Sequence, residues 1–184
     1  MRLTLFPTPL GDCGIAWRGD AVTATQLPEA GSAATAARLT GRTGASEGEP
    51  PAAIRRAIRS MTALLEGDRT DLAFVACDLG GVGSFETAVY AVARDIPPGE
   101  TRTYGAVAST LGDRHLARMV GRALGRNPLP IIVPCHRVVG ANGSLTGFSA
   151  NGGVATKLRM LAIEGARIGD APGLFGDLPL RSKP

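Results

Sequence analysis

The chain has 184 residues, of which 44% are apolar, and its formal net charge is +4. This apolar content suffices for the core of one domain or of two small ones and excludes a disordered protein. The longest apolar runs, 72–77 and 129–135, are far shorter than the roughly 18 residues that a membrane-spanning helix needs. Three widely spaced cysteines and the lack of a secretory cleavage signal favour a cytoplasmic protein in a reducing environment.

The beginning of the chain is predicted to form an antiparallel meander. Residues 2–6, 14–18 and 21–26 read as short strands separated by turn sequences. The next stretch, 28–53, is dominated by Gly, Ala, Ser, Thr and Pro. It therefore predicts a mobile, loop-like insertion or at most one short helix.

A helix and a strand are expected to complete the first domain. Apolar residues recur at helical spacing between 51 and 66, and the continuous apolar run 72–77 is long enough for one buried strand. The glycine-rich sequence 79–83 is typical of a linker. We therefore expect three parts: an α/β domain over 1–80, a second domain over 81–169 and a tail over 170–184.

The second domain is predicted to be mostly helical. Ser84 and Thr103 can each cap a helix, the sequence PPGE at 97–100 ends the first, and 116–125 forms a further helix. Two short helices joined by a tight turn resemble a helix-turn-helix of the winged-helix type. Helical hairpins in ordinary protein cores show the same pattern, so this feature alone does not establish DNA binding.

Basic residues are concentrated in this second half. Residues 101–140 contain six arginines but a single acid, Asp113, and Arg118, Arg122 and Arg126 repeat every four residues. Beside them runs a stripe of small residues, Ala117, Gly121 and Gly125. A smooth, basic helix face is suited to a nucleic-acid groove, although a solvated arginine-rich surface has the same sequence pattern.

Cys135 is the candidate nucleophile. It follows an apolar, proline-containing run and precedes His136. A free thiol with a pKa of about 8.5 is only a few per cent ionised at pH 7, so a neighbouring base would matter. Adjacent side chains in an extended strand point apart, so the two can cooperate only if the backbone turns or a water relays the proton. A buried thiol beside a satisfied histidine is the alternative.

From Phe85 to Glu164 the chain resembles the O6-alkylguanine-DNA alkyltransferases, also called methylated-DNA–protein-cysteine methyltransferases. The shared segments IPPGETRTYG, ARMVGRALGRNPLPIIVPCHRV, GSLTGFS and KLRMLAIEG occur in the family's order. The resemblance implies direct repair of O6-alkylguanine, and of O4-alkylthymine, by irreversible transfer of the alkyl group to Cys135, once per molecule. It further implies a monomer without a cofactor that binds double-stranded DNA in the minor groove and flips the damaged base out.

The resemblance also assigns roles to residues. Cys135 would accept the alkyl group, His136 would act as its base through a water, and Glu164 would orient the imidazole. The residues implied to bind the substrate are Tyr104, Asn127, Val138, Phe148, Ser149 and Lys157. Those implied to contact DNA are Arg102, Ala117, Arg118, Gly121, Arg122 and Arg126.

Within these sets, Tyr104 would rotate the target phosphate and donate a proton or a hydrogen bond to guanine N3, and Arg118 would fill the gap left by the flipped base. Asn127 would be the hinge between the recognition helix and the active-site strand. The carbonyl of Val138 and the amide of Ser149 would read the guanine edge, on a hairpin closed by a turn at 142–143.

Some positions depart from the family pattern. Phe148 stands where many relatives have tyrosine, Tyr90 where many have tryptophan, and the sequence SANGG lengthens the active-site loop. Some relatives bind zinc in the first domain. Here both histidines lie in the second half, so no metal site is expected and Cys13 and Cys77 are interpreted as core thiols.

Two other classes of function are considered. A non-catalytic lesion-binding protein of the alkyltransferase-like type would lack the acceptor cysteine, whereas Cys135 is present. A cysteine hydrolase would need an oxyanion motif, and none is recognisable in the sequence.

Overall fold

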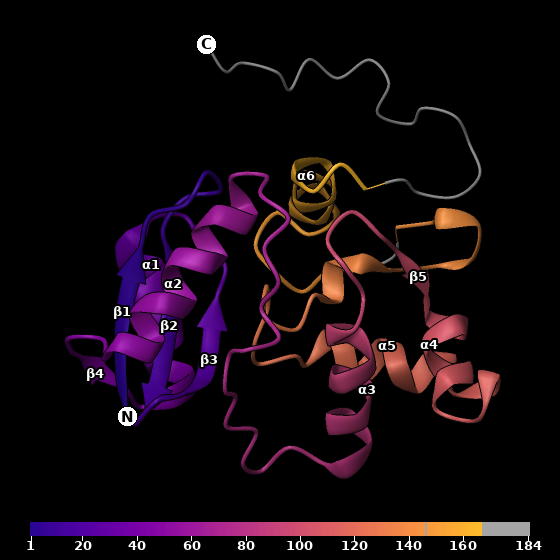
Figure 1. Ribbon diagram of the computed structural model, residues 1–184, viewed down its shortest axis with the longest axis horizontal. Helices are drawn as coiled ribbons and strands as arrows, with labels where there is room; N and C mark the ends of the chain where they lie inside the picture. The colour runs from indigo at the N-terminus through magenta and orange to yellow at the C-terminus, as the bar shows by residue number, and fades with distance from the viewer. Residues whose placement is uncertain (146, 167–184) are drawn as a thin grey trace.

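The structure is a computed structural model that describes residues 1–145 and 147–166 (Figure 1). Its strands are β1 (Arg2–Phe6), β2 (Cys13–Arg18), β3 (Ala21–Gln26), β4 (Ser46–Glu47), β5 (Arg102–Thr103) and β6 (Val138–Val139). Its α-helices are α1 (Ser32–Thr43), α2 (Ala52–Leu65), α3 (Ser84–Arg94), α4 (Tyr104–Thr110), α5 (Ala117–Gly125) and α6 (Val154–Ile163). Its 3-10 turns are η1 (Arg114–Leu116), η2 (Cys135–Arg137) and η3 (Ala141–Gly143). The tail expected over 170–184 lies outside the described residues.

The first part of the chain folds as a four-stranded sheet with the order β3-β2-β1-β4. The meander expected for β1, β2 and β3 is confirmed, because both pairings are antiparallel. Side chains alternate between the two faces of a strand, so Ala16 packs with Leu39 of α1 whereas Ile15 and Trp17 join the cluster that contains α2 residues. One helix thus covers each face of the sheet (Figure 1).

The segment 28–53 differs from the expected loop-like insertion. It contains the three-turn helix α1 and the short strand β4, which pairs in parallel with β1. Leu39 is the only large apolar side chain of α1, and it is fully buried against the sheet. One large apolar residue gives no helical periodicity in the sequence, which explains why the helix was not predicted.

The strand expected over 72–77 is absent from the structure. This segment is irregular, touches β3 through a single bridge between Cys77 and Val22, and leaves Phe74 41% exposed. Its carbonyl groups are satisfied by a side chain from α3: the Arg94 guanidinium donates to the carbonyl oxygens of residues 72, 73 and 75 at 3.0–3.1 Å. Only Leu72 and Val75 of this apolar run are buried, and β3 hydrogen-bonds to it only around Val22, whose amide donates to the Ala76 carbonyl oxygen at 2.9 Å.

The second part is helical as expected, with α4, η1 and α5 following one another closely. Thr103 caps α4, since its Oγ1 accepts a hydrogen bond from the Ala106 amide at 3.0 Å. Ser84 makes no such cap, because α3 begins at Ser84 itself and Gly83 is the capping residue. Tyr90 of α3 donates its hydroxyl hydrogen bond to the Ala123 carbonyl oxygen of α5 at 3.0 Å, which ties these two helices together.

One contiguous cluster of buried apolar side chains joins both parts of the chain. It includes Ile15 of the sheet and Met61 of α2, as well as Val120 of α5 and Ile132 beside the active-site segment. No helix among the described residues is both long and apolar enough to cross a lipid bilayer.

Candidate active site

Cys135 begins η2 at the end of a tightly hydrogen-bonded segment. The Asn127 side chain accepts a hydrogen bond from the Leu129 amide and donates one to the Val133 carbonyl oxygen, both at 2.9 Å. Ile131 lies between these anchors with a φ of 78°, the only positive φ at a non-glycine residue in the described part of the chain. Such a conformation costs about 1–3 kcal/mol and persists only where the surroundings impose it, so this segment is rigidly held.

The free edge of the N-terminal sheet supports this segment from outside. Thr25 of β3 donates its backbone amide to the Pro128 carbonyl oxygen at 2.9 Å and its hydroxyl to the Pro130 carbonyl oxygen at 2.7 Å. Arg42 of α1 adds a longer contact to the Pro128 oxygen at 3.5 Å. Neither Thr25 nor Arg42 is predicted from the sequence, because a side chain that binds backbone oxygens produces no motif.

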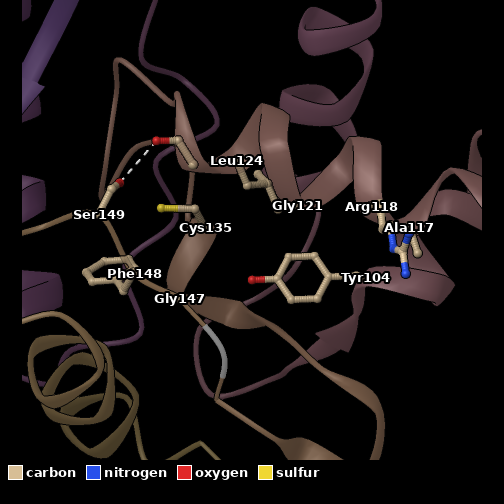
Figure 2. A pocket seen from close by; sticks show the side chains of 10 residues that line it. Tyr104, Ala117, Arg118, Gly121, Leu124, Cys135, Gly147, Phe148 and Ser149 are labelled. Carbon is tan, nitrogen blue, oxygen red and sulfur yellow. Dashed lines mark hydrogen bonds between the residues drawn. The ribbon is translucent and has the colours of Figure 1, made fainter.

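The Cys135 thiol is nearly enclosed, being 9% exposed, and reaches a cavity (Figure 2). Burial raises the pKa of Cys135, while a hydrogen bond from Asn127 and the positive charge of Lys157 oppose that rise. The resting site therefore favours the neutral thiol, and the proton must be removed before sulfur becomes a strong nucleophile.

His136 is fully buried and paired with Glu164. Its Nε2 lies 3.0 Å from Glu164 Oε1, and its Nδ1 has no hydrogen-bond partner among the described residues. Burial lowers the pKa of His136 even though Glu164 acts to raise it, so the ring is neutral at rest. With the proton on Nε2 donated to the carboxylate, Nδ1 is the basic atom. The η2 turn also removes the extended backbone in which Cys135 and His136 would point apart.

Glu164, just after α6, is clamped by Arg137. The guanidinium donates from Nε to Oε2 at 2.9 Å and from Nη2 to Oε1 at 2.8 Å, and its Nη1 donates to the Ile96 carbonyl oxygen at 2.5 Å. Burial alone would raise the pKa of Glu164, but the hydrogen bonds from His136 and Arg137 outweigh it and hold the value at about 2. Arg137 stands inside the PCHRV sequence but was not predicted as a site residue.

Lys157 of α6 is fully buried and forms a hydrogen bond to β6, the strand that follows Cys135. Its Nζ donates to the Val138 carbonyl oxygen at 2.6 Å and lies 5.8 Å from the centre of the Tyr104 ring, within the range of a cation–π contact. Burial lowers the pKa of this ammonium group. The Val138 carbonyl oxygen is expected to accept a hydrogen bond from the edge of guanine. One of its two lone pairs is thus already used by Lys157.

A cavity of about 630 Å³ opens above the thiol. Figure 2 shows Tyr104 on one side with its hydroxyl directed toward the Cys135 side, Phe148 and Ser149 on the other, and the small residues of α5 along the wall. Ser149 closes one edge by donating its hydroxyl to the Gly125 carbonyl oxygen at 3.1 Å. Pockets of this size accommodate small organic ligands, and a planar base could lie between the α5 wall and Phe148.

Comparisons with known proteins agree on one family. A family model described as 6-O-methylguanine DNA methyltransferase, DNA binding domain, matches residues 84–166. The methylated-DNA–protein-cysteine methyltransferase of Methanothermobacter thermautotrophicus is 34% identical over 160 residues, which cover 87% of this chain and 83% of that protein. The chain belongs to the methylated-DNA–protein-cysteine methyltransferase family. The resemblance drawn from the sequence, and the enzyme class and DNA-repair role that it implied, are thereby confirmed.

Solved structures of this family share the fold. The crystal structure of the Mycobacterium tuberculosis O6-methylguanine methyltransferase aligns with a TM-score of 0.73 at 34% identity, covering 95% of this chain and 98% of that one. A second crystal structure, of Mycobacterium tuberculosis OGT in complex with DNA, aligns with a TM-score of 0.72 at 33% identity over 89% of this chain and 93% of that one. The expected combination of an α/β part and a helical part is confirmed at this level.

The residues predicted for this methyltransferase fall into separate groups in the structure. The large cavity is lined by Tyr104, Ala117, Arg118, Gly121, Cys135, Phe148 and Ser149. Arg102 and Arg122 are exposed and do not line it, while Asn127 and Arg126 border a smaller cavity beside it. The turn expected at 142–143 exists, closed by the Gly140 amide and the Ser144 carbonyl oxygen at 2.7 Å. The hairpin expected around this turn is not formed, because residues 144, 145 and 147–149 form no strand.

Proposed function

We propose that this methyltransferase repairs O6-alkylguanine, and O4-alkylthymine, by transferring the alkyl group to Cys135 in a single turnover. The observation that carries the proposal is the juxtaposition of a nearly enclosed thiol, open to a base-sized cavity, with a buried neutral His136 paired to Glu164. A nucleophile, a base and a group that orients the base are the parts that nucleophilic catalysis requires.

In the proposed reaction, His136 Nδ1 takes the thiol proton through a bridging water, and the imidazolium that forms is stabilised by the Glu164 carboxylate. The Cys135 sulfur attacks the alkyl carbon, the bond from that carbon to O6 breaks, and the electron pair stays on guanine. Guanine then takes up a proton from a positioned donor, for which Tyr104 is the candidate. The product is a thioether, which does not exchange as a disulfide does, so the molecule stops after one transfer.

On the DNA side, we propose that residues 81–169 form the DNA-binding alkyltransferase domain and residues 1–80 an N-terminal α/β domain that shares one apolar core with it. The helices α4 and α5, joined by η1, would act as a helix-turn-helix against the minor groove, with the protein as a monomer. Arg118 borders the cavity and would replace the flipped base, whereas Arg102 and Arg122 are exposed and would contact phosphates. The relative crystallised in complex with DNA supports DNA as the partner.

Mass spectrometry of the protein after incubation with an O6-methylguanine duplex tests the proposal. We expect the mass of one methyl group on Cys135, and Cys135→Ala is expected to abolish transfer while retaining duplex binding. Repeated turnover, or a methyl group mapped to Cys13 or Cys77, would contradict the single-turnover mechanism. Duplex binding without any modification would instead indicate a non-catalytic lesion-binding protein.

A further inference from the structure

Thr25 is a fully buried polar residue on β3, an edge strand of the N-terminal sheet, and it contacts the active-site segment. Its backbone amide donates to the Pro128 carbonyl oxygen at 2.9 Å, and its hydroxyl donates to the Pro130 carbonyl oxygen at 2.7 Å. Proline has no backbone N–H, so the backbone of these two residues can only accept hydrogen bonds. Thr25 thus supplies a donor to each of them, one from its backbone and one from its side chain.

Asn127 connects this anchored stretch to the cysteine. Its side chain accepts a hydrogen bond from the amide of Leu129, the residue between the two prolines, and donates one to the Val133 carbonyl oxygen, both at 2.9 Å. The same Val133 oxygen accepts a hydrogen bond from the Cys135 amide at 2.8 Å. A path of hydrogen bonds and short backbone segments therefore runs from Thr25 to the acceptor cysteine.

Ile131, directly after Pro130, shows that the stretch is strained. Its φ of 78° is unfavourable for a β-branched residue and persists only where the surroundings impose it. The hydroxyl of Thr25 restrains the backbone before Ile131, and the Val133 amide, which donates to the Leu129 carbonyl oxygen at 2.8 Å, restrains it from the other side. Loss of the hydroxyl removes one restraint, so the stretch should relax toward an ordinary conformation and displace the side chain that is hydrogen-bonded to it.

We propose that Thr25 is a positioning residue for the transfer reaction: it holds the Asn127 amide where that amide can stabilise the ionised sulfur of Cys135. This role rests on the proposed function, in which the thiol loses its proton before it attacks the alkyl carbon. A hydrogen bond from Asn127 lowers the pKa of Cys135 against the effect of burial. Thr25 does not line the cavity above the thiol, so it acts only through these groups.

A purely structural role is the alternative, and Thr35 of α1 is an example of it. Thr35 is equally buried, and its hydroxyl accepts a hydrogen bond from the Glu29 amide at 3.0 Å and donates one to the Gly31 carbonyl oxygen at 3.1 Å. Both partners belong to the N-terminal part of the chain and do not contact the active-site segment through this hydroxyl. Thr35→Val is therefore the matched control for Thr25→Val.

Thr25→Val removes the hydroxyl and keeps the β-branched shape and the backbone amide. Three quantities are measured on the full chain: the single-turnover rate of transfer from a bound O6-methylguanine duplex, the affinity for that duplex, and the pH profile of Cys135 alkylation by iodoacetamide, with the alkylated site mapped by mass spectrometry. We expect transfer to be about tenfold slower, the scale of one lost hydrogen bond, at unchanged duplex affinity. The iodoacetamide profile should move to higher pH, because the thiolate is less stabilised.

Two variants separate positioning from stability. Thr25→Ser keeps the hydroxyl and should restore both the rate and the pH profile. Thr35→Val should lower the melting temperature and leave the rate and the profile unchanged. If Thr25→Val does not fold, Thr25→Ser and Thr25→Ala give the same comparison, since they differ only in the hydroxyl.

A lowered melting temperature of Thr25→Val with an unchanged rate and profile would overturn the proposal. Equal slowing by Thr25→Ser or by Thr35→Val would do the same, because it would assign the effect to packing or to general destabilisation. Weaker duplex binding with normal transfer from the bound complex would also overturn it and would place Thr25 in the DNA interface. Absence of transfer by the unmodified protein would instead refute the proposed function, and the iodoacetamide profile, which needs no DNA, would still decide whether Thr25 acts on the sulfur.

Discussion

Replacing Glu164 by glutamine should destabilise the protein in a manner that depends on pH. The pKa of Glu164 is about 2 in the folded protein, against an ordinary value of 4.5. At about 1.36 kcal/mol for each pKa unit, this difference corresponds to roughly 3 kcal/mol of folding stability. Because the folded pKa is the lower one, this contribution is complete above pH 4.5 and is lost as the pH falls toward 2. About 1.4 kcal/mol of it should be gone at pH 3.5, one unit below the ordinary value.

Urea unfolding followed by the fluorescence of Trp17, the single tryptophan of the chain, measures this effect. We expect the difference in unfolding free energy between the unmodified protein and Glu164→Gln to be about 3 kcal/mol at pH 7 and clearly smaller at pH 3.5. The exposed Glu100 provides a control, since Glu100→Gln should change stability by less than about 0.5 kcal/mol. A difference for Glu164→Gln that stays constant between the two pH values would refute the reasoning that an ionised Glu164 is stabilised by His136 and Arg137.

Four further predictions concern the reaction and DNA binding. Asn127→Ala should raise the pKa of the Cys135 thiol, because it removes a hydrogen bond that favours the thiolate, and the pH profile of alkylation by iodoacetamide would show this as a shift to higher pH. His136→Ala should slow transfer from a free base such as O6-benzylguanine by about 100-fold or more, the usual scale of general-base catalysis, and an unchanged rate would leave His136 a structural role. Arg118→Ala should slow repair of duplex DNA far more than reaction with the free base, whereas equal slowing would contradict its role in base flipping. Arg122→Ala should weaken binding to all duplexes similarly and reduce the salt dependence by about one phosphate contact.

The elements predicted correctly are those whose side chains alternate or repeat with a clear period. The meander and α2 have such patterns, and the sequence located both. Helix α1 was missed because alanine and threonine surround its one large apolar residue, Leu39. The run 72–77 was wrongly assigned as a strand because its composition is apolar, whereas only Leu72 and Val75 are buried and the carbonyl groups of residues 72, 73 and 75 accept hydrogen bonds from Arg94.

The candidate site could be predicted only where the type of residue itself indicates a reaction. A cysteine next to a histidine indicates nucleophilic chemistry, and the structure places Glu164 against His136 as the family resemblance implied. The sequence does not predict the roles of Thr25, Arg42 and Arg137. Each of them reaches the site through a hydrogen bond to a residue at least 27 positions away in the sequence, and such contacts produce no local pattern. The roles of all these residues in the reaction stay predictions until the variants are measured.

The attachment of the active-site segment to β3 has a consequence for dissecting this protein. The segment matched by the family model, 84–166, contains Cys135, His136 and Glu164, yet Thr25 supplies two of the hydrogen bonds that hold the backbone before the cysteine. An excised fragment of 84–166 would leave the Pro128 and Pro130 oxygens without these donors and would uncover the apolar surface shared with the sheet. Such a fragment should melt with low cooperativity and aggregate. The smallest autonomous unit of this chain is therefore larger than the stretch that contains every reacting group.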